Sequence, residues 1–236
     1  MDEQHRRSLR LPESLRLDAD AAWRSDDDAV VLVRRYFDRQ DTDDEFTGSF
    51  FDEWRVGDPN EITADDLLAV EFLGVAVPPR AARAVLGPHR ARIRLWLEAA
   101  GEDRDLAGSP GRALHEDEAL VALWRLLTGH RDVGPVIASK ILARKRPRLV
   151  PIVDRKVCDL VGVHDHYWLA WGELFERHPH LDRRLQELRR ASGAGPHVST
   201  LRVLDVALWM HATHDVVGDL VTRRRLPRTL GSSDRA

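Results

Sequence analysis

Cysteine is almost absent from this sequence of 236 residues, and what the sequence lacks narrows the class of protein. The single cysteine, Cys158, excludes a disulfide within the chain and an iron–sulfur or zinc site built from four of its own cysteines. The chain has no run of apolar residues long enough to span a bilayer, so we expect no membrane partner. Its first residues, MDEQHRRSLRLPESLRLDADAAW, lack the apolar core of a secretory signal. These absences predict a cytoplasmic protein.

Lysine is also scarce, and positive charge is unevenly distributed. Only Lys140, Lys145 and Lys156 are lysines among 36 basic residues. Residues 1–66 contain 19 acidic and 9 basic side chains, whereas Arg131 to Lys156 contains eight basic and two acidic ones. A whole-chain pI near 6.4 argues against a dedicated nucleic-acid binder, but a local basic stretch favours one.

Apolar residues recur mainly at helical spacing, and alternating β-branched runs are few. We therefore predict a mainly α, two-lobed fold that contains a helix-hairpin-helix motif at about 116–144. The predicted organisation is an N-terminal arm at 1–25, a single helical domain at 26–222 and a flexible tail at 223–236. We expect residues 43–60 and 105–116 to form loops because glycine and proline interrupt them.

The most specific pattern runs from Glu116 to Asp154. A helix predicted to end at Thr128-Gly129 is followed by a short hairpin, and Gly134 permits an unusual backbone angle or the close approach of another chain. Pro135 suits the first position of the next helix, whose free N–H groups favour an anion such as phosphate. That helix is basic, so the pattern predicts contact with a nucleic-acid backbone.

Leu127 to Val157 resembles the helix-hairpin-helix and Gly-Pro-Asp region of the base-excision DNA glycosylase superfamily. Members have an apolar-x-Gly-apolar-Gly hairpin, a small residue near the next helix start, and an aspartate about twenty residues beyond. The positions that match in this sequence are Val133, Gly134, Ala138, Pro151, Val153, Asp154 and Val157.

The resemblance implies a cleft between two helical lobes and hairpin N–H groups on DNA phosphate. Many members hold a monovalent cation on hairpin carbonyls, and otherwise no cofactor and no iron–sulfur cluster is implied here. Asp154 would stabilise an oxocarbenium-like sugar or orient a water as the N-glycosidic bond breaks. The residues implied in DNA binding are Val133, Gly134, Val136, Ala138, Lys140, Arg144 and Lys145.

Two positions depart from the family pattern. Asp132 replaces the first hairpin glycine, and its negative charge would weaken binding of phosphate. Val136 stands where bifunctional members carry a nucleophilic lysine, so we expect no Schiff-base step there and only a monofunctional glycosylase. Lys140, one helical turn further on, is a poor substitute in this reading.

Other readings of the same residues stay open. Asp154 is also a good N-cap for the helix that follows, and the hairpin could be a purely structural turn. The alternatives to a base-excision repair enzyme are a non-catalytic helix-hairpin-helix DNA-binding module and an α-helical protein-interaction domain. The whole chain also resembles an uncharacterised bacterial family with ITADDLLAVEFLGV and LRVLDVALWM segments, from which no activity or protein partner can be inferred.

A flipped base would need aromatic side chains on which to stack. Trp96, Trp124 and Trp209 lie on apolar helix faces and are expected in the core. No metal site is predicted, since the pairs His164–His166 and His178–His180 lack the spacing of a two-histidine zinc site. His211 and His214, three residues apart beside Asp215, give only a weak metal signal. The candidates for a base pocket are Phe50, Phe51, Trp54, Tyr167, Trp168 and Trp171.

Overall fold

The structure, a computed structural model, describes residues 9–39 and 46–213. Within these residues every regular element is a helix and no strand occurs, which confirms the predicted mainly α class. The first elements are η2 (Glu13–Leu15), α1 (Asp28–Phe37), η3 (Thr47–Phe50), α2 (Ala64–Glu71), α3 (Pro79–Leu86) and α4 (Arg90–Ala99). They are followed by α5 (Ala113–Glu116), α6 (Glu118–Thr128), α7 (Pro135–Lys145), α8 (Arg155–Val161), α9 (Tyr167–Arg177), α10 (Leu181–Ser192) and α11 (Thr200–Thr213).

Side-chain caps set several helix starts. Thr63 accepts a hydrogen bond from the Asp66 N–H, and the Asp66 carboxylate accepts one from the Thr63 N–H, so α2 begins with a capping box. Asp117 caps α6 by accepting from the Leu120 N–H. These short-range bonds satisfy N–H groups that have no partner within the helix, so the two side chains fix where α2 and α6 begin.

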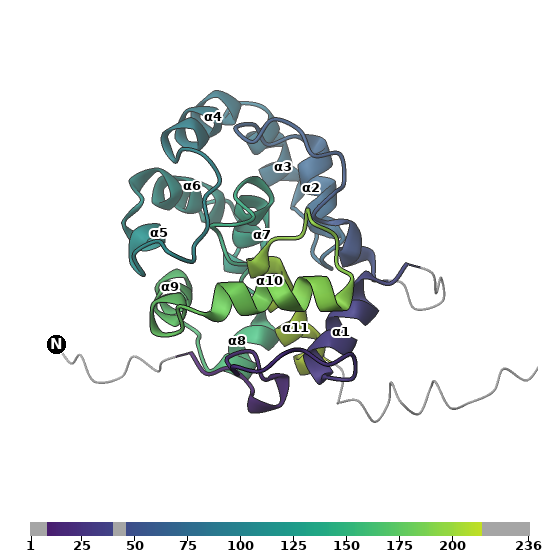
Figure 1. Cartoon of the computed structure of the whole chain (residues 1–236). Coiled ribbons are helices and arrows are strands. Elements are labelled where there is room, and N and C mark those ends of the chain that lie inside the picture. Colours follow the sequence, from purple (N-terminus) through teal and green to yellow (C-terminus); the bar gives the residue numbers. More distant parts are fainter. Residues whose placement is uncertain (1–8, 40–45, 214–236) are drawn as a thin grey trace, which may run out of the picture.

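The helices pack as two groups (Figure 1). The terminal group consists of α1, α8, α10 and α11, which pack on one another. The central group consists of α2, α3, α4, α6 and α7. The short helix α5 packs on both α6 and α9, so it links the central group to the remaining helix. In the sequence, α1 precedes the central group, whereas α8, α10 and α11 follow it. The terminal group is therefore built from two separate parts of the chain.

The chain passes between the groups twice, at residues 51–63 and again at 146–154. The buried side chain of Arg146 connects these two passages: its guanidinium donates to the Pro59 carbonyl and to the Asn60 side-chain oxygen, each at 2.8 Å. A further N–H of Arg146 donates to the Leu97 carbonyl of α4. One side chain therefore holds both passages against the central group.

Residues 9–25 differ from the loosely ordered arm expected for 1–25. Leu9, Leu15 and Leu17 are buried in the core, because they provide an apolar surface that the terminal group covers. The Trp23 indole N–H donates to the Arg184 carbonyl of α10. Residues 1–8 and the expected tail at 223–236 lie outside the described part of the chain. None of the described helices is long and apolar enough to cross a membrane.

The sequence suggested an unusual backbone angle at Gly134, but in the turn between α6 and α7 this angle occurs at Asp132. Asp132 has a φ of 67°, in the left-handed region that aspartate tolerates better than most residues. Gly134 is extended, with a φ of −91°, and a Cβ built on it would meet nothing. Gly134 therefore leaves open space beside the turn.

Candidate functional site

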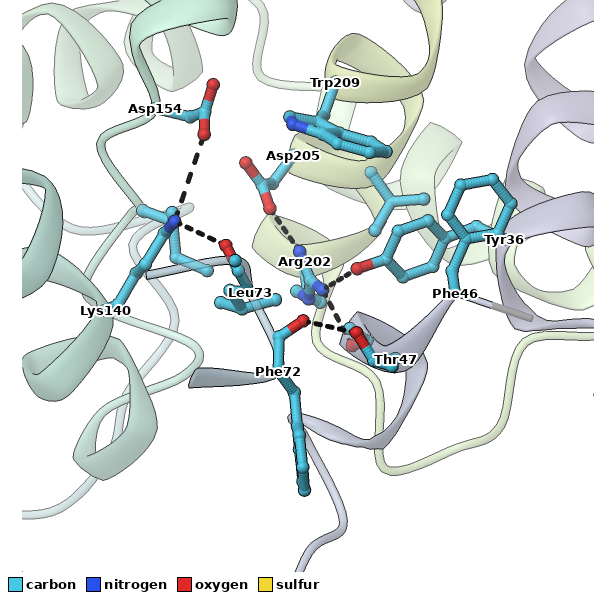
Figure 2. A pocket seen from close by; sticks show the side chains of 14 residues that line it. Tyr36, Phe46, Thr47, Phe72, Leu73, Lys140, Asp154, Arg202, Asp205 and Trp209 are labelled. Atoms are coloured by element: carbon cyan, nitrogen blue, oxygen red, sulfur yellow. Dashed lines mark hydrogen bonds and ion pairs between the residues drawn. The ribbon is translucent and has the colours of Figure 1, made fainter. Parts of the chain in front are cut away.

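A pocket of about 200 Å³ lies where the two groups of helices meet. α1 and α11 form its terminal side, and α7 with the end of α2 forms its central side (Figure 2). Four aromatic rings line it beside two aspartates, a lysine and an arginine. These eight residues are Tyr36, Phe46, Phe72, Trp209, Asp154, Asp205, Lys140 and Arg202.

Asp154 both caps α8 and faces this pocket. One carboxylate oxygen accepts from the Lys156 N–H at 2.9 Å, which is an N-cap bond. The other oxygen lies 4.0 Å from Nζ of Lys140 (Figure 2). The same carboxylate therefore contacts both the first turn of α8 and the lysine in the pocket wall. Capping and a place in the pocket are thus compatible.

Lys140 places an amine in the wall of the pocket. Its side chain is only 3% exposed, and Nζ donates to the Leu73 carbonyl at 3.0 Å. Burial lowers the pKa of Lys140, and the negative charges of Asp154 and Asp205 oppose that shift only in part. A larger fraction of Lys140 is therefore in the neutral amine form than is the case for an exposed lysine.

Arg202 organises the opposite wall. Its guanidinium donates to the Tyr36 hydroxyl at 2.7 Å, to the Gly48 carbonyl at 3.1 Å and to carboxylates of Asp52 and Asp205. Burial raises the pKa of Asp205 to about 6, although the charge of Arg202 opposes the shift. The pocket therefore contains two carboxylates in different settings, one at a helix terminus and one on an arginine.

The basic side chains of α7 point inward and not toward solvent. Arg144 and Lys145 are buried against Asp66, so neither can reach a DNA backbone in this structure. Lys140 lies in the pocket wall. Among the other residues implied in DNA binding, Val133 and Ala138 are buried in the core, Val136 is half-buried and outside the pocket lining, and Gly134 is exposed.

The six aromatic residues proposed for a base pocket lie outside its lining. Phe51, Tyr167 and Trp171 are buried in the core, and the Tyr167 hydroxyl donates to the Ile152 carbonyl. Trp168 packs edge-on against Trp124. The remaining two contact a pocket residue: the rings of Phe50 and Trp54 both meet Phe72 edge-on.

The aromatic residues that do line the pocket were missed because they come from distant segments. Tyr36 and Trp209 look like ordinary apolar positions on their own helices, and their rings meet at 6.1 Å only in the fold. One sequence signal was available. Arg202 and Asp205 form an i, i+3 charged pair within the apolar segment LRVLDVALWM, and such a pair inside a buried helix indicates a polar site.

No metal centre is found within residues 9–39 and 46–213, where no three metal-ligating side chains of the acidic, histidine or cysteine type come together. His214, which follows the last described residue, lies outside this range. Cys158 is buried, and burial raises the pKa of its thiol to about 11, so this thiol is a poor nucleophile.

Comparison with known proteins gives a family but no activity. No curated protein and no solved structure matches this chain. A family model covers residues 29–212, a range that contains every residue of the pocket. By this match the chain belongs to a family of unknown function, DUF6308.

Proposed function

We propose that this protein binds DNA and removes a base from it, with the base entering the pocket at Asp154. The observation that carries the proposal is the position of Asp154: it follows the α6–α7 turn at the spacing described above, and it faces an aromatic-lined pocket. Hydrolysis of an N-glycosidic bond builds positive charge on the sugar, and a fixed carboxylate stabilises that charge.

The pocket suits a planar ring that has left a base stack. Phe46 and Tyr36 stack at 5.2 Å, and Trp209 meets both edge-on, so one wall is a continuous aromatic surface. Asp205 and Lys140 provide polar groups in the same lining. Aromatic surfaces bind any base face, and polar groups at the edge select among bases.

The α6–α7 turn supports contact with the DNA backbone through its main chain. Gly134 is exposed with open space around it, and α7 begins at Pro135, so N–H groups of its first turn point outward. Arg131 on the same turn is 87% exposed. Because Lys140, Arg144 and Lys145 are turned inward, few phosphates would be contacted, and we expect DNA affinity to fall only gently with salt.

The proposal is tested with duplexes that each carry one altered base, followed by alkali to cleave abasic sites. We expect strand breaks for at least one duplex, and loss of those breaks in Asp154→Asn. This variant keeps a side chain that can cap α8, so the fold should survive. If no duplex yields more breaks than the variant does, the protein is not a base-excision enzyme.

The second candidate is a helical protein-interaction domain without DNA binding. The observation that favours it is the inward orientation of the basic side chains of α7, which serve the fold by pairing with Asp66. Fluorescence anisotropy with a labelled duplex at low salt separates the two. Binding supports the DNA proposal, and its absence at low salt supports the interaction domain.

A further inference from the structure

We propose that a second hollow, between residues 19–23 and α10, is a docking site for an extended acidic peptide of a partner protein. The hollow has a volume of about 630 Å³ and is lined by residues 19–23, by His180 and by one face of α10. It shares no residue with the pocket at Asp154. The inference is therefore independent of the proposed base excision, and either can hold without the other.

The segment that forms one side of this hollow is held in place by α10. Arg184 is only 4% exposed, and its guanidinium donates to the Ala21 carbonyl and lies 3.5 Å from the centre of the Trp23 ring. The Trp23 indole N–H in turn donates to the Arg184 carbonyl at 3.1 Å. At the start of α10, Nε2 of His180 lies 3.0 Å from the Asp18 carbonyl oxygen. These contacts fix the hollow before any partner binds, which reduces the entropy lost on binding.

Small side chains give the hollow a floor that a peptide backbone can approach closely. Apart from the ring of Trp23, its apolar lining consists only of alanines, which are Ala19, Ala21, Ala22 and Ala191. The N–H groups of residues 20–23 have no hydrogen-bond partner among the residues that the structure describes. Unpaired backbone groups of an extended segment can pair with a second extended chain, as a strand added to a sheet edge does.

Two arginines beside this floor are available to an anion. Arg190 is exposed, and its side chain has no partner within residues 9–39 and 46–213. Arg183 is 70% exposed, and its contact is with Asp20, which is 4.0 Å away and 99% exposed. An exposed pair at this distance contributes little to stability, so a carboxylate of a partner can replace Asp20. Glu187 lies 3.9 Å from Arg184 and leaves both exposed arginines free for the partner.

The spacing of the two arginines defines the peptide. Arg183 and Arg190 are seven residues apart on one helix, so they lie on the same face and are separated by about 10 Å along the axis. Two residues three apart in an extended chain are also separated by about 10 Å. The site therefore fits a peptide with two acidic residues three apart and small residues between them, which would lie over the alanine floor.

A peptide fits this site better than a nucleic acid does. The floor is apolar, whereas a nucleic-acid backbone presents a continuous row of phosphates that needs a continuous row of cations. Asp20 and Glu187 interrupt the positive charge of the lining and would repel such a row. A peptide can place its two carboxylates at the arginines and neutral residues opposite the acidic side chains.

The experiment selects binders from a library of short randomised peptides on the immobilised full chain. We expect enrichment of sequences with two aspartates or glutamates three residues apart. A selected peptide is then labelled, and its affinity is measured by fluorescence anisotropy. Failure to enrich any peptide, or enrichment of sequences without this acidic pair, overturns the inference. If a DNA duplex displaces the selected peptide and Arg190→Glu abolishes duplex binding, the hollow is a nucleic-acid site and the inference is also wrong.

Variants of the exposed arginines locate the binding site. Arg190→Glu should weaken binding of the selected peptide by about tenfold or more, because it replaces attraction by repulsion. A peptide in which one of the two acidic residues is changed to lysine should bind Arg190→Glu better than it binds the natural protein. Arg80→Ala, at an exposed arginine of α3, is the matched control and should leave the affinity unchanged. Equal affinity of the selected peptide for the natural protein and Arg190→Glu would place its binding site elsewhere and overturn the inference.

Discussion

Lys145 Nζ lies 2.7 Å from one carboxylate oxygen of Asp66, and Arg144 Nε lies 3.2 Å from the other, inside the protein. One acidic side chain on α2 thus forms ion pairs with two adjacent basic side chains on α7, and it also completes the capping box with Thr63. The pairing fixes the central group of helices and removes two basic side chains from the surface.

Asp66→Asn should therefore destabilise the protein strongly, because it leaves two buried cations without a counter-charge. We expect a loss of about 3–5 kcal/mol in the free energy of unfolding, measured by urea denaturation. Asp65→Asn is the matched control: Asp65 is also in the first turn of α2, but its side chain is 42% exposed. Similar losses in both variants would contradict the role of Asp66.

Stability should depend on pH through Asp205. Burial raises its pKa from 3.8 to about 6, so between these values the folded state binds more protons than the unfolded state. Its contribution to stability is complete below pH 4 and is lost as pH rises through 6. The advantage of the natural protein over Asp205→Asn should shrink by up to roughly 3 kcal/mol from pH 4 to pH 7. If the stability advantage over Asp205→Asn instead grew from pH 4 to pH 7, the pKa of Asp205 would be lowered and not raised in the folded protein.

Two variants of Asp154 should separate its role in capping α8 from its role in base excision. Asparagine is as good an N-cap as aspartate, so Asp154→Asn should retain stability, whereas Asp154→Ala should lose about 1 kcal/mol. If the carboxylate acts on substrate, both variants should lose base excision alike. Urea denaturation and the alkali assay together decide the matter. Activity that survives in Asp154→Asn would leave capping as the role of this residue.

Asp132→Gly should improve both stability and DNA binding. Glycine adopts the φ of 67° found at this position without steric cost, a gain of roughly 1 kcal/mol. The change also removes a negative charge beside the exposed turn. We expect a higher melting temperature and tighter binding to a labelled duplex at low salt. Tighter binding that persists unchanged at high salt would argue against an electrostatic cause.

Gly134→Ala should leave the fold intact and weaken DNA binding. The added methyl group meets nothing within the protein, and the φ of −91° suits alanine. It would, however, occupy the space through which a backbone phosphate approaches the turn. We expect an unchanged melting temperature and reduced affinity in anisotropy titrations. Unchanged affinity for DNA would show that the α6–α7 turn is not part of the binding surface.

Local patterns predicted much of the fold. Apolar spacing predicted the helical class, and Gly129 and Pro135 marked the end of α6 and the start of α7. The resemblance of the whole chain to an uncharacterised family is confirmed by the match to DUF6308. Burial of charge was not predictable, because the partner of Arg144 and Lys145 lies about eighty residues earlier in the sequence. The aromatic wall was not predictable for the same reason, because Tyr36 and Trp209 come together only when α1 packs on α11.

Arg146 joins the two passages of chain that run between the helix groups. Its guanidinium holds the passage at Pro59 and Asn60 to its own passage, which continues to Asp154. Substitution of Arg146 would therefore release the passage at Pro59 and Asn60 and the passage that leads to Asp154 together, because one buried guanidinium joins them.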